Sequence, residues 1–596
     1  MTLRRQQHQR KQFKRQLQNR DLFTIRHFIT ICTLICLLAF NVSCRQPSNR
    51  RESRPQDGRR GGTLYIATNS DPRTFNSIAA QETSSTFILS FMFQGLTNIN
   101  FETGQIVPDL ADGWEVSENQ LQWTFHLREG LQWSDGQSLT ADDVLFTYND
   151  VIFNQDIPNS SRDILTVNGQ PIRVEKIDEH SLRFILPEPF APFLRATSAA
   201  ILPKHILESA VQNKQFLNMW ATSTNPDSII CNGPFQLAAY DPGERIILKR
   251  NPHYWKKDQE GTSLPYLDEV YIQVLPSPDL ALMKFKSGEL DVLDVSGRDY
   301  PIVKPNEQRL GYRVVDVGPS LSTNFLVFNL NTDSNVPVEP HKIEWFNDDR
   351  FRQAIAHAID KSKMIEIILN GFGSPLNSAM SPAAGFYYNS QIDNITYDLD
   401  MARHLLYEMG FSDRNADGIL DDANGRELKF TLLTNADNPE RLDMAAMIVH
   451  DLKQIGMKVN LLSLEFNTLV NKLNSSFDWE AVLLGLTGGI EPHFGANVWV
   501  SSGHLHLWHP RQKKAVRKWE KQLDNIFIEG AKQFDEHIRK KLYDQWQEVV
   551  AEYLPVIYTV TPHVIVAIRN KVQNCHPTTL GGTFYNIDEI YLTSDT

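Results

Sequence analysis

Strand and helix patterns alternate along the body of the chain, and this order constrains the fold more than any other feature. Residues 427–435, 440–457 and 458–466 have the patterns of a strand, a helix and a strand in succession. In residues 121–128 apolar and polar side chains alternate, as they do in a half-buried strand. A chain that repeats strand and helix in this way is expected to form α/β layers with partly parallel sheets.

Composition and charge exclude several classes of protein. The 596 residues are 41% hydrophobic and 22% charged, which is typical of a soluble globular protein of several domains. The net charge is −12, but residues 1–62 hold 14 basic and 3 acidic side chains, so the remainder carries −23. An acidic body does not suit a nucleic-acid binder, which needs a basic surface. We expect no nucleic-acid partner.

The N-terminal segment has the pattern of an export signal. Residues 1–27 carry eight basic side chains and one acid, and the uncharged run Phe28–Phe40 that follows is too short for a comfortable membrane span. The run ends near Cys44, in a segment that resembles a bacterial lipobox. We expect a signal peptide over 1–44 with lipidation of Cys44; ordinary cleavage and an uncleaved anchor are the alternatives. Residues 45–62 are rich in Pro, Ser, Gly and Arg and predict a disordered tether.

Removal of the signal leaves two cysteines in the body, Cys231 and Cys575. In an oxidising compartment these cysteines can form a disulfide. Two unpaired buried thiols are an equally good prediction.

Eight segments, in order, resemble the family 5 extracellular solute-binding proteins. That family delivers oligopeptides, dipeptides and, in some members, nickel or opines to ATP-driven importers. The block WTFHLREGLQWSDGQSLTADDV is the most specific of the eight segments. The segments are 95–100, 107–117, 123–144, 232–237, 250–255, 286–292, 351–361 and 402–411.

The resemblance implies a periplasmic-binding-protein fold of type II, in the large three-subdomain variant with mixed sheets. Two lobes would close on a solute about a hinge of two crossover strands, near 320–328 and 554–560. The expected parts are lobe I (63–100), its extra subdomain (101–224), lobe I again (225–319), lobe II (320–556) and a C-terminal return to lobe I (557–596).

The resemblance also implies a ligand site. Peptide-binding relatives place an aspartate for the peptide ammonium four residues before a proline; here that position is Gly488, and Glu491 directly precedes Pro492. Glu491 is a candidate substitute, and a turn or an inter-domain contact is its alternative. The other candidate ligand contacts are Glu82, Thr83, Ser85, Phe466 and Trp499.

Two further groups of residues suggest metal ions. His504, His506 and His509 lie close together in sequence, with His493 upstream, and suit a metal or metal complex, a polar cleft lining or simple packing. A calcium-loop spacing is formed by Asp413, Asn415, Asp417 and Asp421, although position 12 is Asn424 instead of a glutamate. An Asx-rich surface turn is the alternative there, and no other cofactor is expected.

The function that the resemblance implies is capture of peptides or peptide-like solutes for an ABC permease and its ATPase. A receptor for a metal complex or opine, or an extracytoplasmic sensor on the same scaffold, is the alternative. We found none of the nucleophile-elbow, zinc-protease, P-loop or dinucleotide-binding motifs, so we expect no enzyme activity. We expect a monomer on the periplasmic side, anchored to the membrane through Cys44.

Overall fold

The strands of the body gather around two large hydrophobic cores, one for each lobe. The computed structural model describes residues 60–593 apart from 81, 168, 334–335 and 504. The first core is built mainly from residues before Val292 and after Val566, and the second lies between Leu321 and Val560. Because each core has its own sheets, the predicted two-lobed α/β fold is confirmed.

The first lobe contains a four-stranded sheet in the order β1-β12-β11-β10. Strand β1 is parallel to β12, whereas β11 is antiparallel to both of its neighbours. Alternation along β1 buries Leu64 and Ile66. The strands are β1 (Thr63–Thr68), β10 (Phe235–Asp241), β11 (Arg245–Arg250) and β12 (Glu269–Val274).

A second sheet of this lobe has the order β4-β5-β9-β8 and is antiparallel throughout. Strand β5 buries Trp123, Phe125 and Leu127, as the alternation in its sequence predicted. Thr140 caps α3 (Ala141–Leu145) in a capping box with Asp143, also as expected. The strands are β4 (Ala111–Val116), β5 (Gln122–Leu127), β8 (Arg173–Lys176) and β9 (Ser181–Ile185).

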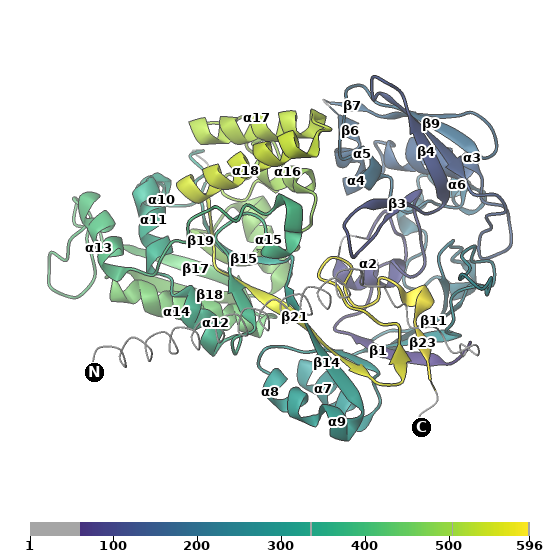
Figure 1. The fold of residues 1–596 in the computed structure, drawn as a ribbon. Helices are drawn as coiled ribbons and strands as arrows, with labels where there is room; N and C mark the ends of the chain where they lie inside the picture. The colour runs from purple at the N-terminus through teal and green to yellow at the C-terminus, as the bar shows by residue number, and fades with distance from the viewer. Residues whose placement is uncertain (1–59, 81, 168, 334–335, 504, 594–596) are drawn as a thin grey trace, which may run out of the picture. The chain divides into compact units, whose positions relative to one another are not determined.

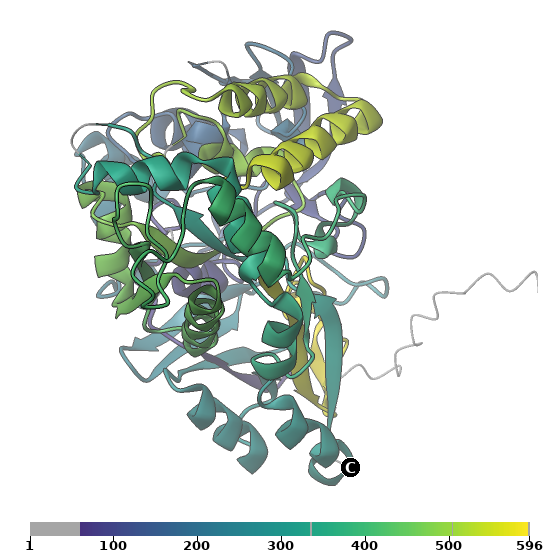
Figure 2. The same ribbon diagram turned by 90° about the vertical axis from the view of Figure 1, so that its left-hand side faces the viewer.

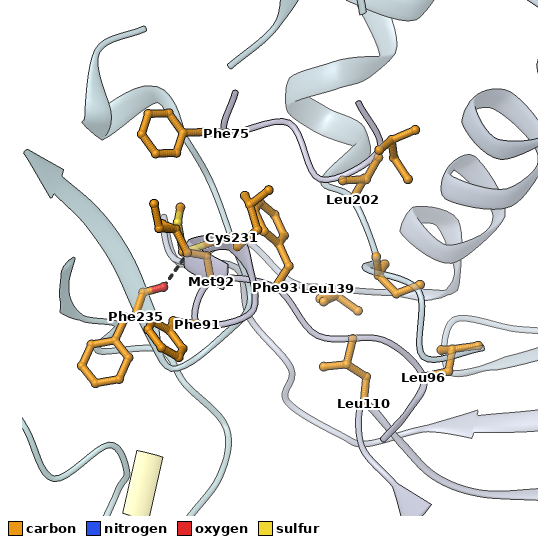
Figure 3. Close-up of a cluster of buried hydrophobic side chains, with 14 of the residues drawn as sticks. Phe75, Phe91, Met92, Phe93, Leu96, Leu110, Leu139, Leu202, Cys231 and Phe235 are labelled. Atoms are coloured by element: carbon orange, nitrogen blue, oxygen red, sulfur yellow. Dashed lines mark hydrogen bonds between the residues drawn. The ribbon is translucent and has the colours of Figure 1, made fainter. Parts of the chain in front are cut away.

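Figure 3 shows part of the first core, where Phe75, Met92 and Phe235 surround Cys231. The Cys231 thiol donates to the carbonyl oxygen of Phe235 at 3.3 Å. Cys575 is also buried and also unpaired, so the two cysteines of the described residues are free thiols with no disulfide between them.

The second lobe contains a five-stranded mixed sheet in the order β18-β17-β19-β15-β20. Strand β17 is parallel to β18 and β19, while β15 is antiparallel to β19 and β20. Helix α14 (Pro439–Gln454) connects β17 to β18, which confirms the predicted strand, helix and strand. The strands are β15 (Thr323–Phe328), β17 (Lys429–Asn435), β18 (Lys458–Leu464), β19 (Ala481–Leu486) and β20 (Val556–Tyr558).

Two chain segments cross between the lobes. Strand β14 (Tyr312–Pro319) runs into β15, and β20 runs into β21 (Val560–Arg569), which pairs with both β14 and β13 (Val292–Asp294). Figure 1 shows β21 leaving the second-lobe sheet toward β14. The expected domain boundaries stay a prediction, because internal contacts join Arg59–Thr596 into one compact unit.

Helices α17 (Lys518–Lys532) and α18 (Glu536–Tyr553) pack side by side at the end of the second lobe (Figures 1 and 2). Among the described residues, no helix combines the length and the apolar character that a membrane crossing needs. The predicted signal, Cys44 and most of the predicted tether lie outside the described residues.

Candidate functional site

The carboxyl ends of the strands locate the candidate site. In open α/β sheets, ligands bind in the crevice outside these ends. In the second lobe, β17 ends at Asn435 and β19 at Leu486; in the first, β1 ends at Thr68 and β13 at Asp294. The polar groups at these edges are therefore the candidate ligand contacts.

Arg441 extends over the edge of the second-lobe sheet. It lies in the first turn of α14, whose N-cap Asn438 accepts a hydrogen bond from the backbone N–H of Arg441. The Arg441 Nε donates to Asn324 Oδ1 at 3.2 Å, and Nη1 donates to Asn435 Oδ1 at 2.7 Å. Among the described residues no carboxylate forms an ion pair with this guanidinium, so several of its five N–H groups remain for a ligand.

Gly485 makes room for this guanidinium. A Cβ at Gly485 would overlap Nη2 of Arg441, so the charged group rests on bare backbone. Burial lowers the pKa of Arg441 by more than Asp437 and Glu440 raise it. A desolvated guanidinium that still has N–H donors available can bind a carboxylate or a carbonyl oxygen of a ligand through charge-assisted hydrogen bonds.

Gly488 cannot carry the aspartate that peptide-binding relatives have there. A Cβ at this position would overlap the backbone carbonyl oxygen of Leu321, which belongs to the crossover between β14 and β15. The neighbouring Gly489 has open space around it. Gly488 can therefore approach a ligand only through its backbone.

Glu491 already has a partner. Both oxygens of its carboxylate accept from Arg539, one of them at 2.9 Å, and the two side chains are 8% and 6% exposed. Although burial lowers it, the Glu491 carboxylate raises the pKa of Arg539 above its ordinary value. The guanidinium also donates to the Tyr387 hydroxyl at 3.0 Å. Glu491 is thus engaged within the second lobe and offers no free charge for a ligand ammonium.

The two lobes touch beside this ion pair. The ring of Phe190 in the first lobe packs against His493 with centroids 5.3 Å apart, and the Ala191 N–H donates to the Ala531 carbonyl at 2.7 Å. Lys532 and Glu188 add an ion pair of 2.8 Å. The segment around Glu491 therefore supports the inter-lobe contact, which is the structural alternative that the sequence left open.

The candidate contacts Glu82, Thr83 and Ser85 lie at the start of α2 (Thr83–Leu89). The Ser85 hydroxyl donates to the Glu82 carboxylate and accepts from the Arg73 N–H, which holds both side chains in a local turn. Thr83 is exposed and is the one of the three that faces solvent. The binding role of this loop stays a prediction.

Phe466 and Trp499 have opposite environments. Phe466 starts α15 (Phe466–Asn471) and is 45% exposed, so its ring is accessible to a ligand. Trp499 is 5% exposed, and its ring packs against Trp508 and Trp546 with centroids 5.5 and 5.3 Å away. That aromatic cluster places Trp499 in the core and not at a ligand surface.

Among the described residues, the histidines near Glu491, namely His493, His506 and His509, have packed environments. His506 is buried, with Nδ1 3.0 Å from the Val498 carbonyl oxygen. Burial lowers the pKa of His493 and of His509 to about 4. His504 lies outside the described residues. Within the described ranges no group of three or more histidine, cysteine or acidic side chains is placed to hold a metal ion.

The calcium-spaced loop folds as a series of turns. The Asp413 carboxylate accepts from the Gly418 N–H at 3.0 Å, and the Asn415 side chain bonds to Asp417 at 3.0 Å. Asp421 is buried and accepts from the Arg414 N–H at 3.3 Å. These contacts match the alternative of an Asx-rich turn, and calcium binding stays a prediction.

Sequence reasoning did not find the Arg441 site. Its three side chains come from positions 324, 435 and 441, which only the pairing of β15, β19 and β17 brings together. The available signal was weak: an arginine in the first helical turn after a strand, with asparagine at the end of that strand.

Comparison with known proteins defines the class. The model of bacterial extracellular solute-binding proteins, family 5 middle, matches residues 105–505. The chain belongs to this family. Its two lobes, its paired crossover strands and the polar strand ends between them are those of a solute-binding protein of the ABC-transporter type.

Individual proteins that resemble this chain are also named as binding proteins. A probable ABC transporter-binding protein of Deinococcus radiodurans is 31% identical over 551 residues, covering 88% of this chain and 91% of the relative. The oligopeptide-binding protein AppA of Bacillus subtilis is 27% identical and covers 92% and 94%. Its structure with a nonapeptide matches at a TM-score of 0.73 and 26% identity, covering 90% of this chain and 100% of AppA. MelB of Agrobacterium fabrum, solved with stachyose, shares the fold at a TM-score of 0.76 and 22% identity, covering 90% of this chain and 86% of MelB.

Proposed function

We propose that this protein captures peptides or peptide-like solutes between its lobes and delivers them to a membrane permease coupled to an ATPase. The observation that carries the proposal is the Arg441 guanidinium at the edge of the second-lobe sheet. This group is desolvated, and not all of its N–H donors are used by described residues. The names of the relatives support peptides as the solute class.

Arg441 acts as the anion-binding group in this proposal. Asn324 and Asn435 fix the plane of its guanidinium, and Gly485 lets it lie on the sheet edge. A peptide carboxylate or main-chain carbonyl then receives two N–H donors from one planar group. Main-chain recognition of this kind tolerates many side chains, which suits a peptide importer.

Closure of the lobes would complete the site. The crossovers between β14 and β15 and between β20 and β21 are short. Small backbone rotations in these crossovers would therefore move the two lobes apart or bring them together. The solute binds the closed form through both lobes, and that form is the one recognised by the permease. The protein itself cleaves nothing and releases its solute intact.

The N-terminal anchor is part of the same proposal. Export is supported by the basic segment at the N-terminus and the apolar run Phe28–Phe40, and lipidation by Cys44. Residues 45–62 would then be the tether between the lipid anchor and the lobes. Mass spectrometry of the membrane fraction tests this: a diacylglycerol-modified Cys44 supports the anchor, and a mature chain that begins elsewhere rejects it.

A thermal-shift panel tests the solute class. It contains free di- to pentapeptides, their N-acetylated forms, and Ni²⁺ or Zn²⁺ with and without chelator. At 100 times its Kd a ligand stabilises by about 2.7 kcal/mol, which raises Tm by several degrees. A shift with peptides supports the proposal; a shift with metal alone, and none with any peptide, rejects it.

A variant pair tests the role of Arg441. Arg441→Gln is expected to weaken peptide binding about 10-fold or more, since it removes a charge-assisted contact. Arg403→Gln is the matched control, because Arg403 is exposed and bonds to Asp400 and the Gln454 carbonyl. Equal affinity in the two variants would reject Arg441 as a ligand contact.

A further inference from the structure

The helical hairpin formed by α17 and α18 connects the two hydrophobic cores. Along their lengths both helices pack in the second core, through side chains such as Leu523 and Phe527 of α17 and Val550 of α18. At the turn between the helices the contacts are with the other lobe, because Ala531 belongs to the first core and Phe534 packs against it. One element of the second lobe therefore ends in the hydrophobic core of the first.

The apolar part of this contact is aromatic. The ring of Phe534 lies nearly parallel to that of Trp123 in β5, with centroids 6.3 Å apart and 23° between the planes. Trp123 is 5% exposed, and Phe494 of the second lobe also packs against the first core. Separation of the lobes would expose these apolar rings to water, which is unfavourable.

The polar part of the contact completes the end of a helix. The last four carbonyl groups of an α-helix have no partner within the helix. The carbonyl of Ala531, in the last turn of α17, accepts from the Ala191 N–H of the first lobe at 2.7 Å. The next residue, Lys532, forms an ion pair of 2.8 Å with Glu188 of the first lobe. Opening of the lobes therefore breaks a hydrogen bond and an ion pair at this turn.

The charges around Lys532 identify Glu188 as its partner across the lobes. The hydrogen bond and the charge of Glu188 raise the pKa of Lys532, and the charge of Glu529 adds to this effect. Glu529 lies on α17 itself, so its attraction for Lys532 is the same in the open and the closed arrangement. The attraction of Glu188 is the part that depends on closure.

The position of the turn makes its contacts sensitive to the angle between the lobes. Helix α18 has 18 residues, so it is about 27 Å long, and it leads into β20, which belongs to one of the two crossovers. A rotation of only ~10° about the crossover end would move the other end of α18 by up to ~5 Å, which no hydrogen bond tolerates. These contacts therefore require the closed arrangement.

We propose that the α17–α18 turn is a latch that holds the lobes closed and thereby sets how tightly the protein binds any solute. This inference rests on the proposed function in one respect, namely that the solute binds the closed form. The apparent Kd is inversely proportional to the fraction of molecules that is closed before binding. None of the latch contacts involves a group of the Arg441 site, so the latch lowers the Kd of every solute by the same factor.

A double-mutant cycle on the ion pair tests the latch, with peptide affinity measured by calorimetry. Lys532→Glu and Glu188→Lys each place two like charges against one another, so each variant is expected to bind every peptide about 5-fold more weakly. The combined variant restores opposite charges and should regain wild-type affinity. Lys521→Glu, at an exposed position of α17, is the matched control and should bind as the wild type does. A loss that persists in the combined variant, or no loss in either single variant, overturns the inference.

Small-angle X-ray scattering of the ligand-free proteins tests the latch separately from the proposed function. The radius of gyration of Lys532→Glu should exceed that of the wild type and of the combined variant, because a larger fraction of the molecules is open. Equal radii in the three proteins overturn the latch. Absence of peptide binding by the wild type rejects the proposed function, and the scattering comparison then still decides on the latch.

Discussion

Glu491→Gln separates a structural role of Glu491 from a ligand role. The wild-type carboxylate is 8% exposed and holds both of its oxygens on the buried Arg539. Neutralising it leaves the guanidinium buried without a full partner, which costs about 3–5 kcal/mol. Glutamine keeps one acceptor, so we expect the lower end of that range, about 3 kcal/mol.

The loss is measurable as a shift in Tm. For a unit the size of one lobe, about 2–4 °C are lost per kcal/mol, so the variant should melt roughly 6–12 °C lower. Peptide affinity of the folded variant, measured well below its Tm, should equal that of the wild type. Glu289→Gln is the control, because Glu289 forms an exposed ion pair of 2.7 Å with Lys284; its Tm should not move. An unchanged Tm in Glu491→Gln together with lost peptide affinity would refute this reasoning.

Four further predictions follow from single contacts. Gly488→Asp should lower Tm and gain no affinity for peptides, because its Cβ meets the Leu321 carbonyl, whereas Gly489→Asp should fold normally; equal Tm values would contradict the overlap. Burial raises the pKa of Cys231 and of Cys575 to about 12, so neither thiol should react with a maleimide at pH 7 until the protein is denatured, and two labels on the native protein would be the contrary result. Burial lowers the pKa of His493 and of His509 from 6.5 to about 4, so between these pH values the unfolded state binds more protons than the folded state. Tm should therefore fall as the pH is lowered from 6.5 toward 4, and it should fall less in His493→Gln than in the wild type. The same pH dependence of Tm in the two proteins would show that His493 contributes nothing. At the Asp413 loop we propose weak calcium binding: chelation should lower Tm in the wild type but not in Asp417→Asn, and no response in either protein rejects the ion.

Local sequence patterns predicted the elements whose determinants are local. Alternation in β5 set which side chains are buried, and Thr140 with Asp143 set the start of α3. The strand, helix and strand from β17 to β18 were also visible, because each depends on its own period. The two-lobed fold came from the family resemblance and was not visible in any one pattern.

The candidate site was less predictable because its chemistry depends on partners distant in sequence. The sequence does not show that Glu491 is paired with Arg539, 48 positions later. It also does not show that the ring of Trp499 packs against two other tryptophans and is therefore unavailable for stacking on a ligand. The Arg441 site could not be predicted from sequence because one of its two asparagine partners, Asn324, lies 117 positions earlier.

The most direct test of the central claim is a retention experiment. The purified protein is mixed with free peptides, N-acetylated peptides, an α-galactoside and a nickel–histidine complex, separated by gel filtration, and the bound fraction is identified by mass spectrometry. We predict that peptides elute with the protein and are recovered intact. Retention of the sugar or the nickel complex alone, or recovery of cleaved peptides, would contradict the account.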